Sequence, residues 1–538
     1  MHNIKFTRDY LPKPSVNINT ITRSKNQVLQ LNKNEFLKCC IGLVAVKNLP
    51  LNIFNDERYF KRLINPYLEE YSLNLSSENM VDALEFWALR IRTYLKIKLH
   101  KKPLSLKLDV VGRHGKNILV IHVQQLEKYE IVVHTLGTIQ LKTKPTSQTL
   151  KEAIWKCLKD YEIEGHQLYA VSSDSRGRSL KALQLIQDEM EENDMEIEEN
   201  LQKPIFSIVF NGSYVIELAA RIYFKTIDGD LKQCRQVIKA IHDRQMENMF
   251  LPSLDNSQRW KSTYDMVFSL KEFITNSEIE FEFEEKLEWL DSFLQTHEPL
   301  HVWSQQQHSE QYIVGDFYRD WLVCEAKLKQ WPRNEYAMHL LEAMLELKQT
   351  MLDNEAFNAA LYFDPRFNHL DTPYFSEERK KQAVSHAMRL EALMKSLDGA
   401  NKLLSEDYEI QYHGKGMGRV EDPYNILEAE MPIICRNSTS LETNPSLCHK
   451  LENLAYAQRL PYSTNILEFW KHMQIKDTQI HGLLKVILGV VISQSSIERT
   501  FNALSTLLTK TKSKMSRTAM ENMLLVKLNA DILDIVEA

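Results

Sequence analysis

Asp109 and Asp174 are the residues whose setting best fits a chemical role. Asp109 lies within an apolar run, and Asp174 follows the strand-like run Leu168–Ser173. Burying a charged carboxylate in an apolar strand costs roughly several kcal/mol of free energy unless the group is paired or binds a cation. If the two strands are neighbours, both carboxylates meet at one edge, where Mg²⁺ or Mn²⁺ would relieve their repulsion and promote phosphodiester cleavage. The alternative is that each is a turn former or helix cap.

The segments that must position these aspartates alternate in type. Short β-rich runs are predicted at 106–111, 118–123, 130–135, 168–172 and 205–210, and helices at 147–161, from about 179, and at 213–224. The resulting order βββαβαβα predicts a mixed sheet covered by helices. Residues 34–99, 227–400 and the stretch from 466 onward show helical periodicity.

Composition agrees with a helix-rich α/β protein. The 538 residues are 43% apolar and 26% charged, which excludes wholesale disorder, and the low counts of 15 glycines and 16 prolines favour helices. The net charge of −6 excludes a uniformly basic nucleic-acid binder. That charge averages the acidic run 188–199 with basic segments at 1–33, 90–102 and 510–517, so local DNA contacts remain compatible with it. The alternatives for the first two basic segments are an unstructured tail and a solvated helix face.

The chain is expected to be soluble and intracellular, with no membrane partner. Its seven cysteines are scattered without a C-x-x-C pair, the N-terminus carries no apolar leader, and Lys485 interrupts the longest apolar run.

Five short segments, in order, resemble motifs of the hAT superfamily of transposases from about residue 37 to the C-terminus. They are SLKLDVVGRHGKNILVIHVQ, YAVSSDSRGRSLKAL, DNSQRWKSTYDMV, NAALYFDPRF with Asp364, Pro365 and Arg366, and ILEFWK followed by ISQSSIERTFNALSTLLTKTKSKMS.

The resemblance implies an RNase H-like core interrupted by a large all-α insertion, with an N-terminal helical region. The implied domains are a flexible basic arm (1–33), an N-terminal helical domain (34–102), the first part of the core (103–226), the helical insertion (227–465), and the last part of the core with the C-terminal dimerisation region (466–538).

The resemblance also implies site residues. Asp109, Asp174 and Glu498 would form a catalytic triad holding Mg²⁺ or Mn²⁺. Trp260 would stack on a flipped base, and Arg259 and Arg499 would contact DNA. The alternative for Trp260 and Arg259 is a buried helix anchor.

Departures from the family pattern weaken the catalytic interpretation. Asp174 is followed by Ser-Arg-Gly-Arg-Ser where the family has D-N-x-x-N-M, and Asn211 and Tyr214 stand where it has C-x-x-H. The BED zinc finger is missing, and the adjacent Cys39 and Cys40 cannot replace it. Loss of supporting groups typically weakens a metal site about 10–100-fold.

The favoured hypothesis is therefore a domesticated, non-catalytic nuclear protein derived from a hAT transposase. It would bind DNA or chromatin proteins and form a homodimer or higher oligomer through its C-terminal region, where Met520, Met523, Leu524 and Leu528 form an apolar stripe. One alternative is an active Mg²⁺- or Mn²⁺-dependent transposase or endonuclease. Another is a protein-interaction scaffold without DNA contact.

Overall fold

The computed structural model describes most of the chain, in ranges separated by gaps of which 399–445 is the longest. These are 31–56, 58–113, 115–141, 145–173, 177–195, 205–243, 251–256, 260–276, 289–306, 309–398, 446–456, 459–473, 477–493, 495–510 and 515–536. The chain divides into two compact units, Met1–Asp82 with Glu537–Ala538, and Ala83–Val536. Residues 1–30 of the predicted basic arm, 511–514 of the basic segment at 510–517, and 196–199 of the acidic run lie outside the described residues.

The first unit is helical, as its periodicity predicts. It contains α1 (Lys33–Ala45), η1 (Leu51–Asn55), α2 (Phe60–Glu70) and the start of α3 (Ser77–Leu99). Asn32 caps α1, its side chain accepting from the Glu35 amide while the Glu35 carboxylate accepts from the Asn32 amide. The rings of Phe36 and Tyr67 stack 4.8 Å apart and join α1 to α2.

The second unit is organised by one mixed sheet among the described residues. Its strands are β1 (Leu104–Arg113), β2 (Lys116–Glu127), β3 (Glu130–Leu141), β4 (Leu168–Ser173) and β5 (Ser207–Phe210). The strand order is β3-β2-β1-β4-β5. β1, β2 and β3 pair antiparallel, whereas β4 and β5 run parallel to β1. The predicted element order and mixed sheet are thus confirmed.

Each face of the sheet is covered by helices. Leu106 and Leu108 are buried on the face contacted by α4 (Ser147–Asp160) and α5 (Arg178–Met195), with η2 (Gly165–Gln167) leading into β4. Side chains alternate along a strand, so Lys107 and Asp109 point to the opposite face. There α17 (Thr478–Ile487) contacts β2, and α18 (Ser495–Lys510) contacts β1 and β2.

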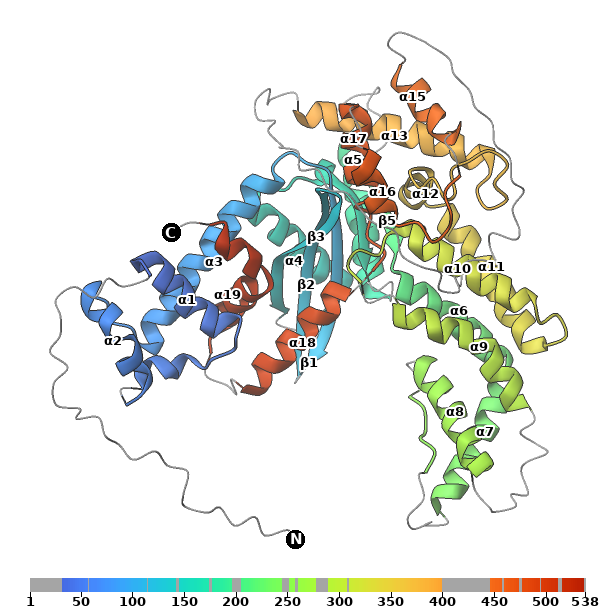
Figure 1. Ribbon diagram of the computed structural model, residues 1–538, viewed down its shortest axis with the longest axis horizontal. Helices are drawn as coiled ribbons and strands as arrows, with labels where there is room; N and C mark the ends of the chain where they lie inside the picture. Colours follow the sequence, from blue (N-terminus) through green and yellow to red (C-terminus); the bar gives the residue numbers. More distant parts are fainter. Residues whose placement is uncertain are drawn as a thin grey trace. The chain divides into compact units, whose positions relative to one another are not determined.

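A long run of helices separates β5 from α17 in the sequence (Figure 1). Its elements are α6 (Gly212–Thr226), α7 (Asp228–Asp243), α8 (Trp260–Asn276), α9 (Trp289–Gln306), α10 (Val314–Lys329), α11 (Glu335–Leu352), α12 (Glu355–Tyr362), α13 (Glu377–Asp398), α15 (Leu447–Asn453), η4 (Leu454–Tyr456) and α16 (Ile466–Met473). Their buried apolar side chains form one cluster with residues of the sheet.

The C-terminal segment returns to the sheet, and α18 is drawn beside β1 and β2 in Figure 1. After α18, α19 (Arg517–Leu528) packs on β3 and is followed by η5 (Ala530–Asp534). The helical run is also tied to the sheet at β3, an edge strand. The Gln311 side chain accepts from the Ile131 amide at 2.8 Å and donates to its carbonyl at 3.0 Å, which occupies edge groups that would otherwise be open.

Candidate functional site on the α18 face

Four polar side chains cross the sheet on its α18 face. Thr135, His122, Lys107 and Ser172 are successive cross-strand partners on β3, β2, β1 and β4. All four are at most 2% exposed. We call these residues the polar row.

Helix α18 caps the polar row with hydroxyl groups. The Lys107 amino group donates to Ser496 Oγ at 3.1 Å. His122 Nε2 lies 3.1 Å from Thr500 Oγ1, and its Nδ1 lies 2.9 Å from Thr135 Oγ1. Because a hydroxyl can donate or accept, a neutral imidazole is satisfied on both nitrogens.

Burial controls the protonation of the row. Desolvation, helped by the charge of Arg499, lowers the pKa of Lys107 from 10.5 to about 7. Desolvation also lowers the pKa of His122 from 6.5 to about 3, with Lys107 and Arg499 acting in the same direction. The imidazole is therefore neutral near pH 7, and the amine is balanced between its two forms.

Asp109 lies two residues beyond Lys107 on the same face of β1 and is half-buried. Its Oδ1 accepts from the Val110 amide at 2.6 Å. Glu498 lies in the first turn of α18 and is exposed. The structure thus brings Asp109 and the helix that carries Glu498 to one face of the sheet.

The remaining predicted acid, Asp174, lies outside the described residues. β4 is described up to Ser173, which pairs with Leu108. Within the described part of the chain, no group of three or more His, Cys, Asp or Glu side chains could hold a metal ion. These residues alone do not form a donor set for Mg²⁺ or Mn²⁺.

The predicted DNA contacts are only partly described. Arg499 on α18 is 54% exposed and forms an ion pair with Glu310, which precedes α10. Arg259 lies outside the described residues. Trp260 begins α8 and is only 9% exposed within the apolar cluster, which favours the helix-anchor alternative.

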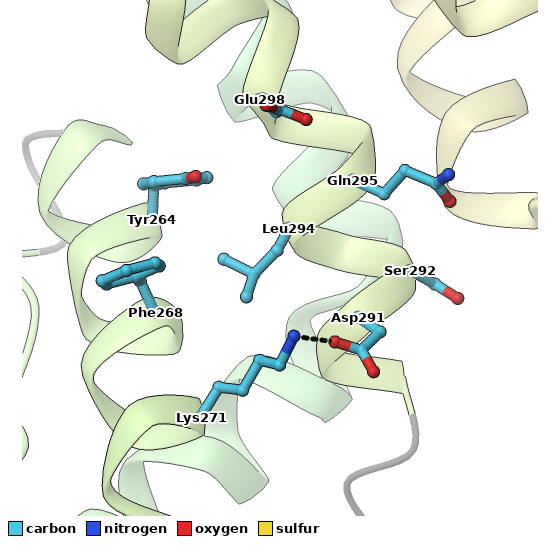
Figure 2. A pocket seen from close by; sticks show the side chains of 8 residues that line it. All are labelled: Tyr264, Phe268, Lys271, Asp291, Ser292, Leu294, Gln295 and Glu298. Carbon is cyan, nitrogen blue, oxygen red and sulfur yellow. Dashed lines mark ion pairs between the residues drawn. The ribbon is translucent and has the colours of Figure 1, made fainter. Parts of the chain in front are cut away.

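The more accessible aromatic surface on α8 lies beyond Trp260. Figure 2 shows Tyr264 and Phe268 of α8 opposite Leu294 of α9, lining a cavity of about 450 Å³. Phe268 is 44% exposed, and Tyr264 stacks on His301 with ring centroids 4.3 Å apart. Lys271 and Asp291 form an ion pair beside the cavity (Figure 2).

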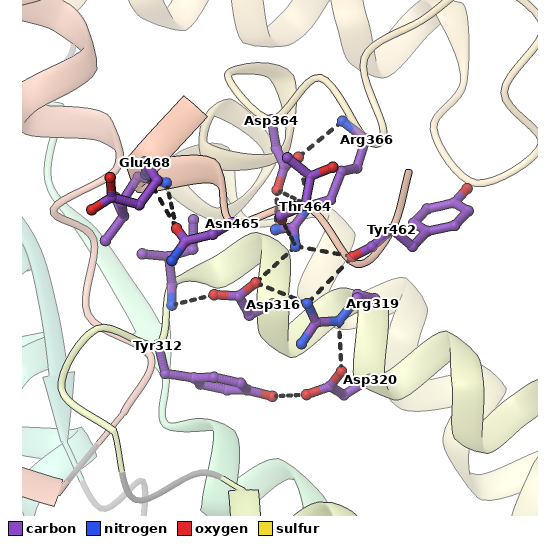
Figure 3. Close-up of polar contacts among 12 residues, drawn as sticks. Tyr312, Asp316, Arg319, Asp320, Asp364, Arg366, Tyr462, Thr464, Asn465 and Glu468 are labelled. Atoms are coloured by element: carbon purple, nitrogen blue, oxygen red, sulfur yellow. Dashed lines mark hydrogen bonds and ion pairs between the residues drawn. The ribbon is translucent and has the colours of Figure 1, made fainter. Parts of the chain in front are cut away.

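Asp364 and Arg366 form a buried ion pair in the helical run, which we call the staple (Figure 3). Both side chains are completely buried. Arg366 Nη2 donates to Asp364 Oδ2 at 2.6 Å, and its Nη1 donates to Asp316 of α10 at 2.8 Å. Although burial by itself lowers the pKa of Arg366, these two carboxylates raise it, so the guanidinium stays charged.

The staple continues along α10. Arg319 Nε donates to Asp320 Oδ1 at 2.8 Å, and the Tyr312 hydroxyl donates to Asp320 Oδ2 at 2.7 Å (Figure 3). Gly315 makes room for the pair, since a Cβ at this position would lie 1.8 Å from Asp364 Oδ2. The absence of a side chain at this point on α10 is therefore required by packing.

Other residues noted in the sequence have structural roles. Asn211 caps α6 by accepting from the Ser213 amide at 3.0 Å. Met520, Met523 and Leu524 are buried, and Leu528 is half-buried, on the helix that packs on β3. This apolar stripe is therefore part of the packing within one chain.

Sequence reasoning missed Lys107, His122 and their hydroxyl partners. A signal was present: Ser105, Lys107 and Asp109 alternate with leucines, as they do when one face of a strand is polar.

No protein-family model matches the chain, and no curated protein matches it in sequence. In the part of the chain that the structure describes, no helix has the length and apolar character needed to cross a membrane.

Proposed function

We propose that this chain is a hAT transposase-derived protein that binds DNA without cleaving it. The proposal includes an RNase H-like core interrupted by the helical run between β5 and α17, and a nuclear location. The observation that carries it is the return of α18 to the Asp109 face of the sheet, since the resemblance implies a split core whose last acid lies on a C-terminal helix.

Local charge supports the non-catalytic form of this proposal. Lys107 is buried on the same face of β1 as Asp109, and Arg499 follows Glu498 directly on α18. Positive charge near these carboxylates raises the electrostatic cost of placing a divalent cation there. Exposed basic groups can instead contact phosphates, as proposed for Arg499.

DNA retention and cleavage test the proposal together. Purified full-length chain should retain a DNA duplex at low salt, with an affinity that falls as log[salt] rises, because phosphate contacts release counterions. With Mn²⁺ it should leave the DNA intact, and Asp109→Asn should retain DNA as the parent does. Failure to retain DNA at low salt would overturn DNA binding and favour the scaffold alternative.

The catalytic alternative rests on Asp109, which is half-buried on the face covered by the helix of Glu498. Mn²⁺-dependent cleavage by the parent chain that is lost in both Asp109→Asn and Glu498→Gln would establish it. Lys239→Gln, on an exposed face of α7, is a suitable control for a change of one charge.

Self-association through the C-terminal region is part of the same proposal. The apolar stripe on α19 does not support it, because that stripe is already used within the chain. Sedimentation equilibrium of the full chain tests it directly, and a monomer across the micromolar range would contradict it.

A further inference from the structure

A second polar site lies at the other end of β1. A cavity of about 440 Å³ is lined where β1 begins and β2 ends, by residues that include Ser105 and Gln124. Ser105 precedes Asp109 by four residues, which is roughly 13 Å along an extended strand. This cavity is therefore distinct from the Asp109 site.

The cavity lining is strongly basic. Four lysines from four segments contribute: Lys98 at the end of α3, Lys102 before β1, Lys128 in the β2–β3 turn, and Lys485 in the last turn of α17. Glu127 is the acidic residue in the lining.

One lysine is already neutralised by that acid. Lys98 Nζ lies 2.8 Å from Glu127 Oε1 and 2.9 Å from His134 Nε2. The four lysines and one glutamate of the lining give it a formal charge of +3, in a chain whose net charge is −6. A concave site with a local excess of one sign concentrates the opposite ion.

Lys128, one of the lysines that line the cavity, lies in the β2–β3 turn in a strained left-handed backbone conformation. Lys128 and Tyr129 have φ angles of +48° and +63°, the left-handed region that a two-residue hairpin turn usually fills with Asn-Gly. Tyr129 packs against His481, with ring centroids 5.7 Å apart. Lys128 is exposed and lines the cavity, so its side chain gains little from packing there. Retained strain of this kind is typical of binding sites.

We propose that this cavity binds a phosphoryl group, carried either by a small molecule or by a nucleic-acid backbone. Lys102, Lys128 and Lys485 of its lining would supply the charge. The inference does not rest on the proposed function, because it concerns different residues and a different end of the sheet.

Pyrophosphate is the probe that tests this site. At low ionic strength it should raise the unfolding temperature of the full chain in a concentration-dependent way. Lys485→Gln should weaken pyrophosphate binding by about tenfold or more, the usual effect of losing a charged hydrogen bond. The control Lys239→Gln, which removes one charge from an exposed face of α7, should bind as the parent does.

Lys128→Asn separates binding from folding. Asparagine adopts left-handed backbone more readily than lysine, so this variant should unfold at the same or a higher temperature without ligand, yet respond less to pyrophosphate. A parent chain that does not respond to pyrophosphate would overturn the proposal. Responses equal to the parent in both Lys485→Gln and Lys128→Asn would also overturn it.

A competition experiment identifies the source of the phosphate. If a short DNA duplex displaces pyrophosphate, the site takes a backbone phosphate, and if pyrophosphate binding is unaffected, it takes a small phosphorylated molecule. DNA retention combined with no pyrophosphate response would contradict this site alone, so its failure differs from failure of the proposed function.

Discussion

Arg366 in the helical run and Lys107 beneath α18 are both completely buried cations, but their surroundings differ. Arg366 is held between the carboxylates of Asp364 and Asp316. Lys107 donates to the neutral Ser496 hydroxyl, and Arg499 adds a repulsive charge. At Arg366 the protein compensates a buried charge with opposite charge, whereas at Lys107 the amine is close to losing its proton.

The difference shows how burial can serve two purposes. A paired charge that is fully hydrogen-bonded fixes the geometry of its neighbours, and removing one partner is costly. A buried amine that donates to a neutral hydroxyl keeps the local charge adjustable. The staple therefore belongs to the framework, whereas the polar row lies directly beneath the candidate site.

The largest effect is expected from Arg366→Met. This change leaves the completely buried Asp364 without its cation, so the free energy of unfolding should fall by about 3–5 kcal/mol. The shift of the urea unfolding midpoint measures it, with Lys239→Gln on an exposed helix face as the control. A loss below about 1 kcal/mol would show that the staple does not depend on charge pairing.

Lys107→Met should act in the opposite sense. With a pKa of about 7 when folded and 10.5 when unfolded, Lys107 binds more protons in the unfolded chain between those values. The free energy of unfolding of the parent should therefore increase as pH rises from 7 towards 10.5, by at most about 1.4 kcal/mol per pH unit.

At pH 7 Lys107→Met should be as stable as the parent or more so, and its stability should vary less over that pH range. Urea titrations at pH 7, 8 and 9 measure both properties. Strong destabilisation at pH 7 would mean that a carboxylate pairs with Lys107, and the contrast with Arg366 would then disappear.

His122→Gln is expected to have the smallest effect. His122 has a pKa of about 3 when folded and 6.5 when unfolded, so protonation of the unfolded chain lowers stability as pH falls from 6.5 towards 3. Glutamine can still bond to Thr135 and Thr500, so at pH 7 the change should cost about 1 kcal/mol or less.

Between pH 6.5 and 4 the stability of His122→Gln should fall less steeply than that of the parent. The difference between the two urea midpoints at each pH isolates this residue from other titrating groups. Equal slopes would mean that His122 is protonated in the folded chain, and that the polar row tolerates charge.

The sequence predicted the strands well because their pattern is local. The strands show as short β-rich runs bounded by turn-like residues such as Gly112 and Gly115, and the alternation of polar residues with buried leucines in β1 assigns its two faces. The order of strands and helices then restricted the sheet to a mixed arrangement. The partners on α18 could not be predicted in this way, since Ser496 lies 389 residues from Lys107.

The motif around Asp364 and Arg366 gives the same lesson. The residue types of this motif contributed to the family resemblance. Nothing in the neighbouring sequence indicates that both side chains are buried, or that Arg366 also binds Asp316, 50 residues away. The requirement for glycine at position 315 could not be predicted locally either. It arises because a Cβ there would collide with the Asp364 carboxylate, which comes from a distant part of the sequence.

The sequence by itself determined the element order, the mixed sheet and the position of Asp109 in its first strand. These follow from side-chain periodicity, which depends only on near neighbours. The tertiary structure decided that α18 covers the Asp109 face, that Trp260 is buried, and that four lysines line one cavity. These outcomes depend on which distant segments bury their apolar surfaces against one another, and this is decided only when the whole chain packs.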